Sequence, residues 1–143
     1  MDIKPYNDEL RDDLIFVWER SVRATHTFLK KEDIDYYKSI VVTINFNDFQ
    51  VYCALADGGE LMGFVGVADG KMEMLFLHPS YIGQGIGKAL ALYAIDKLGA
   101  TKVDVNEGNK TATEFYKGLG FEVYDRTEKD SEGKDYPILK MRL

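Results

Sequence analysis

The sequence has very little cysteine and histidine, and this scarcity excludes two kinds of site. Among 143 residues there is one cysteine, Cys53, and there are two histidines, His26 and His78. A single cysteine cannot form an internal disulfide, so a reducing compartment is favoured. The three side chains are scattered without the spacing of metal ligands, and we therefore expect no metal site.

Long apolar runs and an excess of positive charge are also missing. No apolar run approaches the length that crosses a membrane, and the first residues, Met-Asp-Ile-Lys-Pro-Tyr, lack a signal-peptide pattern. We therefore expect a cytoplasmic protein that does not act at a membrane. The 24 acidic residues against 18 basic ones give a net charge of −6. This balance argues against nucleic-acid binding and mildly favours a cationic small molecule as partner.

The overall composition is typical of a globular protein. Hydrophobic residues make up 45% and aromatic residues 13%, and residues 1–143 suffice for one domain with a single substantial core. Apolar spacing and turn residues predict the order β-α-α-β-β-β-α-β-α-β-β. Strands are expected at 2–6, 49–56, 61–68, 72–77, 102–105, 121–126 and 136–143, and helices from residue 7 or 8, at 31–43, at 85–98 and from 109 to 120. Hairpins joined by two crossovers predict an α+β or α/β sandwich, with a mixed, mostly antiparallel sheet of about seven strands flanked by four helices.

The most informative segment is a glycine-rich turn between a strand and a helix. Residues 77–89 read Leu-His-Pro-Ser-Tyr-Ile-Gly-Gln-Gly-Ile-Gly-Lys-Ala. Glycines at 83, 85 and 87 allow the main chain to present several N–H groups to a phosphate at the start of a helix. A tight strand-to-helix turn without any ligand also favours glycine. The spacing fits neither the dinucleotide-binding Gly-x-Gly-x-x-Gly motif nor the P-loop motif, which disfavours a general nucleotide-binding domain.

A second segment, residues 106–121, begins with Asn106 and ends with Phe121. Asn109 and Tyr116 are seven residues apart and share one face of the expected helix. Taken alone, the asparagine is typical of a helix cap and the tyrosine of a core position.

Together the two segments resemble the acetyl-CoA-dependent N-acetyltransferases of the GNAT superfamily. Residues 79–87 match its Pro-x-x-[Arg/Gln]-Gly-x-Gly-x-Gly pattern except at Ile82, and residues 106–121 match Asn-x-x-Asn-x-x-Ala-x-x-Phe-Tyr-x-x-x-Gly-Phe. The expected order of elements matches that GNAT-like fold from end to end. Trp18-x-x-Ser21-Val22-x-x-Thr25-His26-x-Phe28-Leu29 is similar to a small bacterial subgroup.

The resemblance implies a bacterial enzyme that moves an acetyl group from acetyl-CoA to a primary amine by direct attack in a ternary complex. It implies that the main chain around the glycines binds the coenzyme A pyrophosphate. The strand end, Phe76 and Leu77, would pair with the pantetheine arm in a gap beside the strand at 102–105, with an amide near Leu77 facing the thioester carbonyl. The cofactor residues implied are Phe76, Leu77, Gly83, Gln84, Gly85, Ile86, Gly87, Lys88, Asn106 and Asn109.

The resemblance also implies that Tyr116 protonates the leaving thiolate, because a thiolate expelled into a water-poor cleft needs a proton. Ile82 stands where the family has arginine or glutamine, so a charge-assisted contact to the cofactor is lost. That departure puts cofactor affinity in doubt more than cofactor identity.

Two residues are candidates for the base that deprotonates the amine. By strand alternation Glu73 shares a face with Leu75 and Leu77, and burial there would raise its pKa; the alternative is a solvated glutamate near Lys71. His26 follows the first helix, where the family builds its acceptor pocket, and the alternative is a structural histidine.

An acceptor site could be lined by four aromatic residues, although such aromatics are usually core: Trp18, Phe28, Tyr36 and Tyr136. The acidic cluster from Asp125 to Glu132 is expected to be a solvated loop.

Two functions of different classes remain as alternatives. One is the acetyltransferase, and the other is a module that binds or senses acyl-CoA without transferring the acyl group. The acceptor is a small-molecule or peptide amine that the sequence does not identify further. A homodimer is an alternative to a monomer, since dimers are common in the superfamily.

Overall fold

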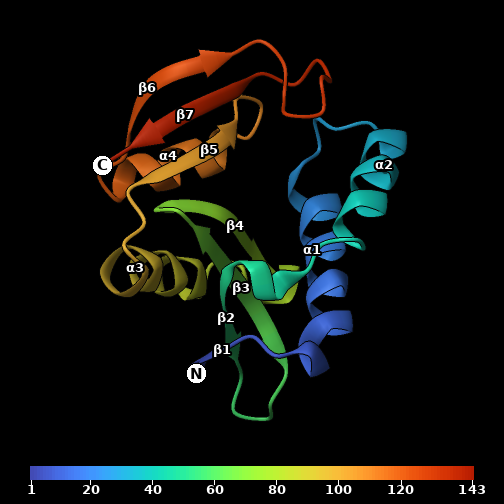
Figure 1. The fold of residues 1–143 in the computed structure, drawn as a ribbon, viewed down its shortest axis with the longest axis vertical. Helices are drawn as coiled ribbons and strands as arrows, with labels where there is room; N and C mark the ends of the chain where they lie inside the picture. The colour runs from blue at the N-terminus through green and yellow to red at the C-terminus, as the bar shows by residue number, and fades with distance from the viewer.

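Seven strands form one sheet in the order β1-β2-β3-β4-β5-β7-β6 in the computed structural model, which describes residues 1–143 (Figure 1). Every neighbouring pair is antiparallel except β4 and β5. This confirms the predicted mixed, mostly antiparallel sheet. The strands are β1 (Asp2–Pro5), β2 (Gln50–Leu55), β3 (Leu61–Ala68), β4 (Lys71–Leu77), β5 (Lys102–Asn106), β6 (Glu122–Thr127) and β7 (Ile138–Arg142).

Four helices cover the two faces of the sheet, as predicted. They are α1 (Arg11–Thr25), α2 (Lys31–Val41), α3 (Ile86–Leu98) and α4 (Lys110–Gly118), with 3₁₀ turns η1 (Asp8–Leu10), η2 (Phe46–Asp48) and η3 (Pro79–Tyr81). The first helix begins later than expected, because the side chain of Asn7 caps η1 by accepting from the amide of Glu9 at 2.9 Å. None of the helices is long and apolar enough to cross a membrane.

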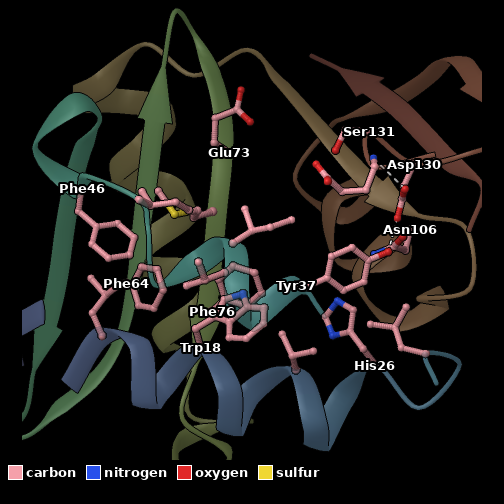
Figure 2. A pocket seen from close by; sticks show the side chains of 18 of the residues that line it. Trp18, His26, Tyr37, Phe46, Phe64, Glu73, Phe76, Asn106, Asp130 and Ser131 are labelled. Carbon is pink, nitrogen blue, oxygen red and sulfur yellow. Dashed lines mark hydrogen bonds between the residues drawn. The ribbon is translucent and has the colours of Figure 1, made fainter. Parts of the chain in front are cut away.

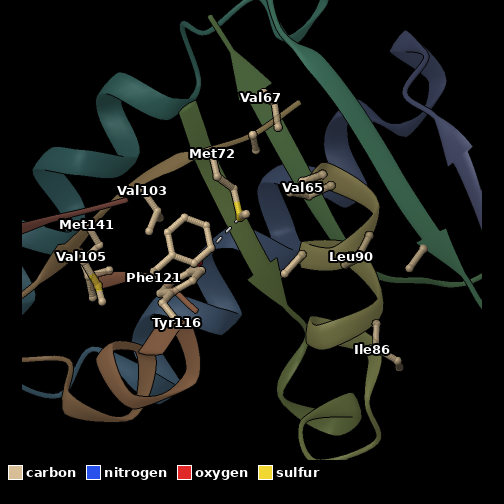
Figure 3. Close-up of a cluster of buried hydrophobic side chains, with 14 of the residues drawn as sticks. Val65, Val67, Met72, Ile86, Leu90, Val103, Val105, Tyr116, Phe121 and Met141 are labelled. Carbon is tan, nitrogen blue, oxygen red and sulfur yellow. Dashed lines mark hydrogen bonds between the residues drawn. The ribbon is translucent and has the colours of Figure 1, made fainter. Parts of the chain in front are cut away.

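Each face of the sheet has its own hydrophobic core. On one face α3 and α4 pack on Val65, Met72 and Phe121 (Figure 3), and on the other α1 and α2 pack on Phe64 and Phe46. Strand β3 contributes to both cores because its successive side chains point to opposite faces. This central strand is buried along nearly its whole length, which fixes the sheet between the helix layers.

Strands β4 and β5 diverge after a short paired stretch. Their pairing comprises only Lys71 with Lys102 and Met72 with Val103, while β4 continues to Leu77 beside β3. The backbone of His78 faces β3, because its amide donates to the carbonyl of Met62 in that strand at 2.9 Å. Because successive residues of a strand direct their N–H and C=O groups to opposite sides, Leu75 and Leu77 direct theirs into the gap. The fold therefore leaves unpaired backbone groups beside β5, as the resemblance implied.

Candidate active site

The glycine-rich turn presents a row of free amides. None of the N–H groups from Gly83 to Lys88 donates a hydrogen bond within the protein, and the first amide of α3 that does is that of Ala89, to Gly85 at 3.0 Å. Gly83 and Gly85 have φ of +83° and +81°, in the left-handed region that favours glycine, and space is open beside both. Six free donors at the positive end of a 13-residue helix form a site for a phosphate or diphosphate.

A cavity of about 560 Å³ extends from this turn along β4. We call it the glycine-loop cavity, and its walls come from α1, β4, the turn and α4. Among its lining residues are Phe76, Leu77, Gly83, Gly85, Gly87, Lys88, Asn109 and Tyr116. The structure thus brings most of the predicted cofactor residues into one space.

Three predicted cofactor residues do not line this cavity. The side chain of Gln84 turns back and donates to the carbonyl of Ser80 at 3.1 Å, and Ile86 is buried in the core, so both could contribute only their amides. Asn106, at the end of β5, lines a different cavity, described below. Its carbonyl accepts from the amide of Asn109 at 2.9 Å, which shapes the turn before α4.

Asn109 caps α4 as predicted. Its side-chain oxygen accepts from the amide of Ala112 at 3.1 Å, and its side chain also lies on the wall of the glycine-loop cavity. The cap fixes the start of the helix that carries Tyr116 two turns later.

Tyr116 is buried, and its hydroxyl lies at the closed end of the gap between β4 and β5. Its ring packs edge-on against Phe115 and Phe121, and its oxygen lies 4.0 Å from the sulfur of Met72 (Figure 3). Met72 is one of the last residues at which the two strands are paired. Burial raises the pKa of the phenol. Its proton is therefore retained at ordinary pH and is not donated to a nitrogen or oxygen of the protein.

A second cavity, of about 360 Å³, lies on the opposite face of β4 under α1 and α2 (Figure 2). We call it the α1–α2 cavity. Most of its wall is apolar, including Trp18, Phe64 and Phe76. Its polar lining residues include the carboxylates of Glu73, Asp130 and Glu132. An apolar wall with acidic groups suits a cationic head on a hydrocarbon chain.

The loop between β6 and β7 closes this cavity by binding α2. The hydroxyl of Tyr37 donates to Asp130, that of Tyr36 donates to Glu132 at 2.9 Å, and that of Tyr136 donates to Asp33. The ammonium of Lys134 lies 3.0 Å from the other oxygen of Asp33. Sequence reasoning missed this clasp between α2 and the loop: for Tyr36 and Tyr136 it weighed only an acceptor wall against the core, and it expected the acidic cluster to be solvated.

Glu73 does not lie where strand alternation placed it. A β-bulge in β4 pairs Gly66 with Met74 but Val67 with Met72, which leaves Glu73 as the extra residue. Glu73 therefore lines the α1–α2 cavity with Met74 and Phe76, whereas Leu75 and Leu77 line the other one. Its side chain is 37% exposed and 4.0 Å from the ammonium of Lys71, so of the two alternatives the structure shows the solvated glutamate near Lys71 and not the buried one.

His26 lies at the end of α1 and contacts both cavities. Its backbone amide donates to the carbonyl of Val22 at 2.8 Å, and its ring lies beside Phe28, with 5.5 Å between the centroids. Burial lowers the pKa of the imidazole below its usual value. The neutral form that this favours has a lone pair able to accept a proton.

Comparison with known proteins places these features in one family. Residues 7–121 match the model of the acetyltransferase (GNAT) family. The chain is 36% identical, over 141 residues, to the peptidyl-lysine N-acetyltransferase YjaB of Salmonella typhimurium, covering 99% of this chain and 97% of that one.

Solved structures also share the fold, and two of them illustrate the similarity. One is the solution structure of the apo form of YjaB from Escherichia coli, with a TM-score of 0.89, 32% identity and coverage of 99% and 95% of the two chains. The other is the PaiA N-acetyltransferase from Thermoplasma acidophilum in complex with coenzyme A, with a TM-score of 0.72, 25% identity and full coverage of both chains.

Proposed function

This chain belongs to the acetyltransferase (GNAT) family, and from that premise we propose that it acetylates the side-chain amine of lysine in proteins or peptides. Acetyl-CoA-dependent N-acetyl transfer is its activity. The choice of lysine draws on the YjaB relatives, which are named peptidyl-lysine N-acetyltransferases. We also propose that the motif from Trp18 to Leu29 marks a small bacterial subgroup of the family.

The single observation that carries the proposal is the pair of cavities on opposite faces of β4. The glycine-loop cavity has free amides for a diphosphate and a strand edge for an amide-bearing arm, so its residues fit coenzyme A. The α1–α2 cavity has apolar walls for the four methylenes of lysine and the carboxylates of Glu73, Asp130 and Glu132 for its ammonium.

Acetyl-CoA supplies an activated acetyl thioester when it is bound. The amide of Leu77, free in the gap, would donate to the carbonyl oxygen as negative charge develops on it. Tyr116 would donate its hydroxyl proton to the departing sulfur as the C–S bond breaks, and its phenolate would then take up the second proton, which the nitrogen loses as the amide forms. Glu73 or His26, directly or through water, would accept the proton that the ammonium must lose before its nitrogen forms the new C–N bond.

Direct transfer is supported by the state of the one cysteine. Cys53 is fully buried in the core under α1, and burial raises the pKa of its thiol to about 12. A thiol in this state is a poor nucleophile and is out of reach of either cavity. A covalent acetyl-cysteine intermediate therefore has no support, and the amine itself is proposed to attack the thioester.

The test compares three acceptors at equal concentration with acetyl-CoA, following thiol release. They are a peptide with one lysine and a blocked N-terminus, the same peptide with arginine for lysine and a free N-terminus, and spermidine. We expect kcat/KM to be at least about tenfold higher for the lysine peptide, with mass spectrometry placing the acetyl group on the lysine. Faster reaction with either of the others would overturn the lysine assignment, and coenzyme binding without amine-dependent thiol release would show a pure binding module.

A further inference from the structure

The two cavities share only two lining residues, His26 and Phe76. If the amine enters through the α1–α2 cavity and the thioester lies in the glycine-loop cavity, the reacting atoms meet where these residues lie. Phe76 has no titratable group. His26 is therefore the one titratable side chain at the junction, whereas Glu73 lines only the α1–α2 cavity and lies at the other end of it from His26 (Figure 2).

The neighbouring threonine determines which ring nitrogen of His26 carries the proton. The hydroxyl of Thr25 donates to the carbonyl of Ser21 at 2.7 Å, and its oxygen is 2.8 Å from Nδ1 of His26. Because the hydroxyl has a single proton and uses it on Ser21, the second contact needs a donor on the histidine. Nδ1 is then protonated, and Nε2 carries the lone pair.

The other nitrogen, Nε2, is free to react. It makes no hydrogen bond within the protein, and the protein contains no side-chain nitrogen that is both sealed from solvent and unpartnered. Nε2 is therefore accessible from cavity space.

We propose that Nε2 of His26 accepts the proton of the attacking ammonium and that Thr25 is a positioning residue that holds the tautomer needed for this. In the step, an N–H bond of the ammonium breaks and the Nε2–H bond forms, giving an imidazolium and a neutral amine. The imidazolium returns its proton to water in the open cavity. This inference rests on the proposed N-acetyl transfer, and it selects His26 rather than Glu73 as the base.

The charges around His26 set the expected pH dependence. The ionisable groups that share a cavity with it are Tyr37, Glu73, Asp130 and Glu132 on one side and Lys88 and Tyr116 on the other. Asp130 already accepts a hydrogen bond from Tyr37, and the Glu73 carboxylate lies near Lys71. Desolvation lowers the pKa of His26, so the imidazole is neutral above that pKa and kcat/KM falls as pH drops through it.

The first experiment measures kcat/KM against pH for His26→Gln, Thr25→Val and Thr25→Ser. At pH 7.5 we expect a loss on the order of 100-fold for His26→Gln and about tenfold for Thr25→Val, with recovery in Thr25→Ser. The acid limb of the profile disappears in His26→Gln, while the Kd of acetyl-CoA changes less than about twofold. His78→Asn and Thr43→Val are matched controls, because neither residue lines the glycine-loop cavity or the α1–α2 cavity and Thr43 likewise donates to a helix carbonyl, that of Ile40.

The second experiment reads the tautomer directly from the ¹⁵N shifts of the His26 ring above its pKa. We expect Nδ1 to be protonated in the wild type and the Nε2–H form to rise in Thr25→Val. A wild-type ring protonated on Nε2, or full activity in His26→Gln, would overturn the inference. If instead lysine proves not to be the acceptor, the tautomer result still stands, and the profiles are measured with whichever amine reacts.

Discussion

The hydroxyl oxygen of Tyr116 lies 4.0 Å from the sulfur of Met72, and no nitrogen or oxygen of the protein accepts its proton. A thioether is a weak acceptor, so the phenol proton is held by burial more than by a partner. The same hydroxyl lies at the apex of the gap between β4 and β5, beside the glycine-loop cavity. Its position suits donation to a sulfur that arrives from that gap.

Replacing Tyr116 by phenylalanine removes this proton and little else. We expect kcat to fall on the order of 100-fold, while the Kd of acetyl-CoA stays within about twofold. The free energy of unfolding should change by less than about 1 kcal/mol, because the lost hydroxyl has only the weak Met72 contact. Steady-state kinetics, calorimetric binding and thermal unfolding check the three values, and a Tyr116→Phe enzyme as fast as wild type would refute the acid role.

Gly85 precedes α3 with a φ of +81°, and its substitution should weaken coenzyme binding. An alanine there costs roughly 1–2 kcal/mol in a left-handed conformation, and relaxation would tilt the neighbouring amides. We expect the Kd of acetyl-CoA for Gly85→Ala to rise about tenfold.

Gly118 offers the matched control for this variant. It ends α4 with a negative φ and open space beside it, so Gly118→Ala should bind acetyl-CoA as wild type does. If both alanine variants bind equally well, the turn is not the diphosphate site.

Ile82 lies half exposed on the wall of the glycine-loop cavity, at the position where the motif that this segment resembles has arginine or glutamine. Ile82→Arg should add a charged donor near the diphosphate and lower the Kd of acetyl-CoA. Because the position is exposed and screened, we expect a gain of about two- to fivefold, larger at low salt. Ile82→Leu is the control for shape, and an arginine variant indistinguishable from it across a salt series would argue that the diphosphate lies elsewhere.

Asp33 joins α2 to the β6–β7 loop, and its titration should weaken the clasp in acid. Hydrogen bonding from Tyr136 and then Lys134 holds its pKa below the usual value of 3.8. The Asp33 carboxylate therefore binds a proton more tightly in the unfolded chain than in the folded one. Its contribution to the stability of the folded state is complete above about pH 5 and is lost as pH falls through its pKa in the folded protein.

Thermal unfolding between pH 3 and 7 measures this effect. Asp33→Asn should lower the Tm at pH 7. The difference in Tm between wild type and variant should become smaller as the pH is lowered toward 3. Asp96→Asn, at a residue without an ion pair, is the control. A difference that is constant across this range would show that the carboxylate charge does not hold the loop.

Short-range patterns in the sequence were enough to predict the order of the helices and strands and the position of the glycine-rich turn. Strand alternation, helix spacing and turn residues act over a few residues, and so the seven strands, the four helices and the Asn109 cap were predicted correctly. The boundaries were less accurate: the last strand begins at Ile138, not 136, because the preceding residues belong to the clasp.

What escaped prediction depends on contacts between distant residues. The bulge at Glu73 reverses which face its carboxylate occupies, and it arises from pairing with β3 that alternation within one strand cannot reveal. Tyr37 and Asp130 are 93 residues apart, so their hydrogen bond has no local signature. Thr25 was visible only as a neighbour in a motif and His26 only as one of two candidate bases, because the choice between the bases depends on two cavities meeting at the end of α1.

We propose that the free amides from Gly83 to Lys88 bind the diphosphate of acetyl-CoA beside the open edge of β4. A titration of ¹⁵N-labelled protein with acetyl-CoA examines this residue by residue, because each backbone amide reports separately. We expect the amide resonances of Gly83 to Lys88 and of Leu77 to shift and saturate together at one equivalent, while those of β1 stay fixed. Saturable binding that leaves the amides of the glycine turn unshifted would contradict it.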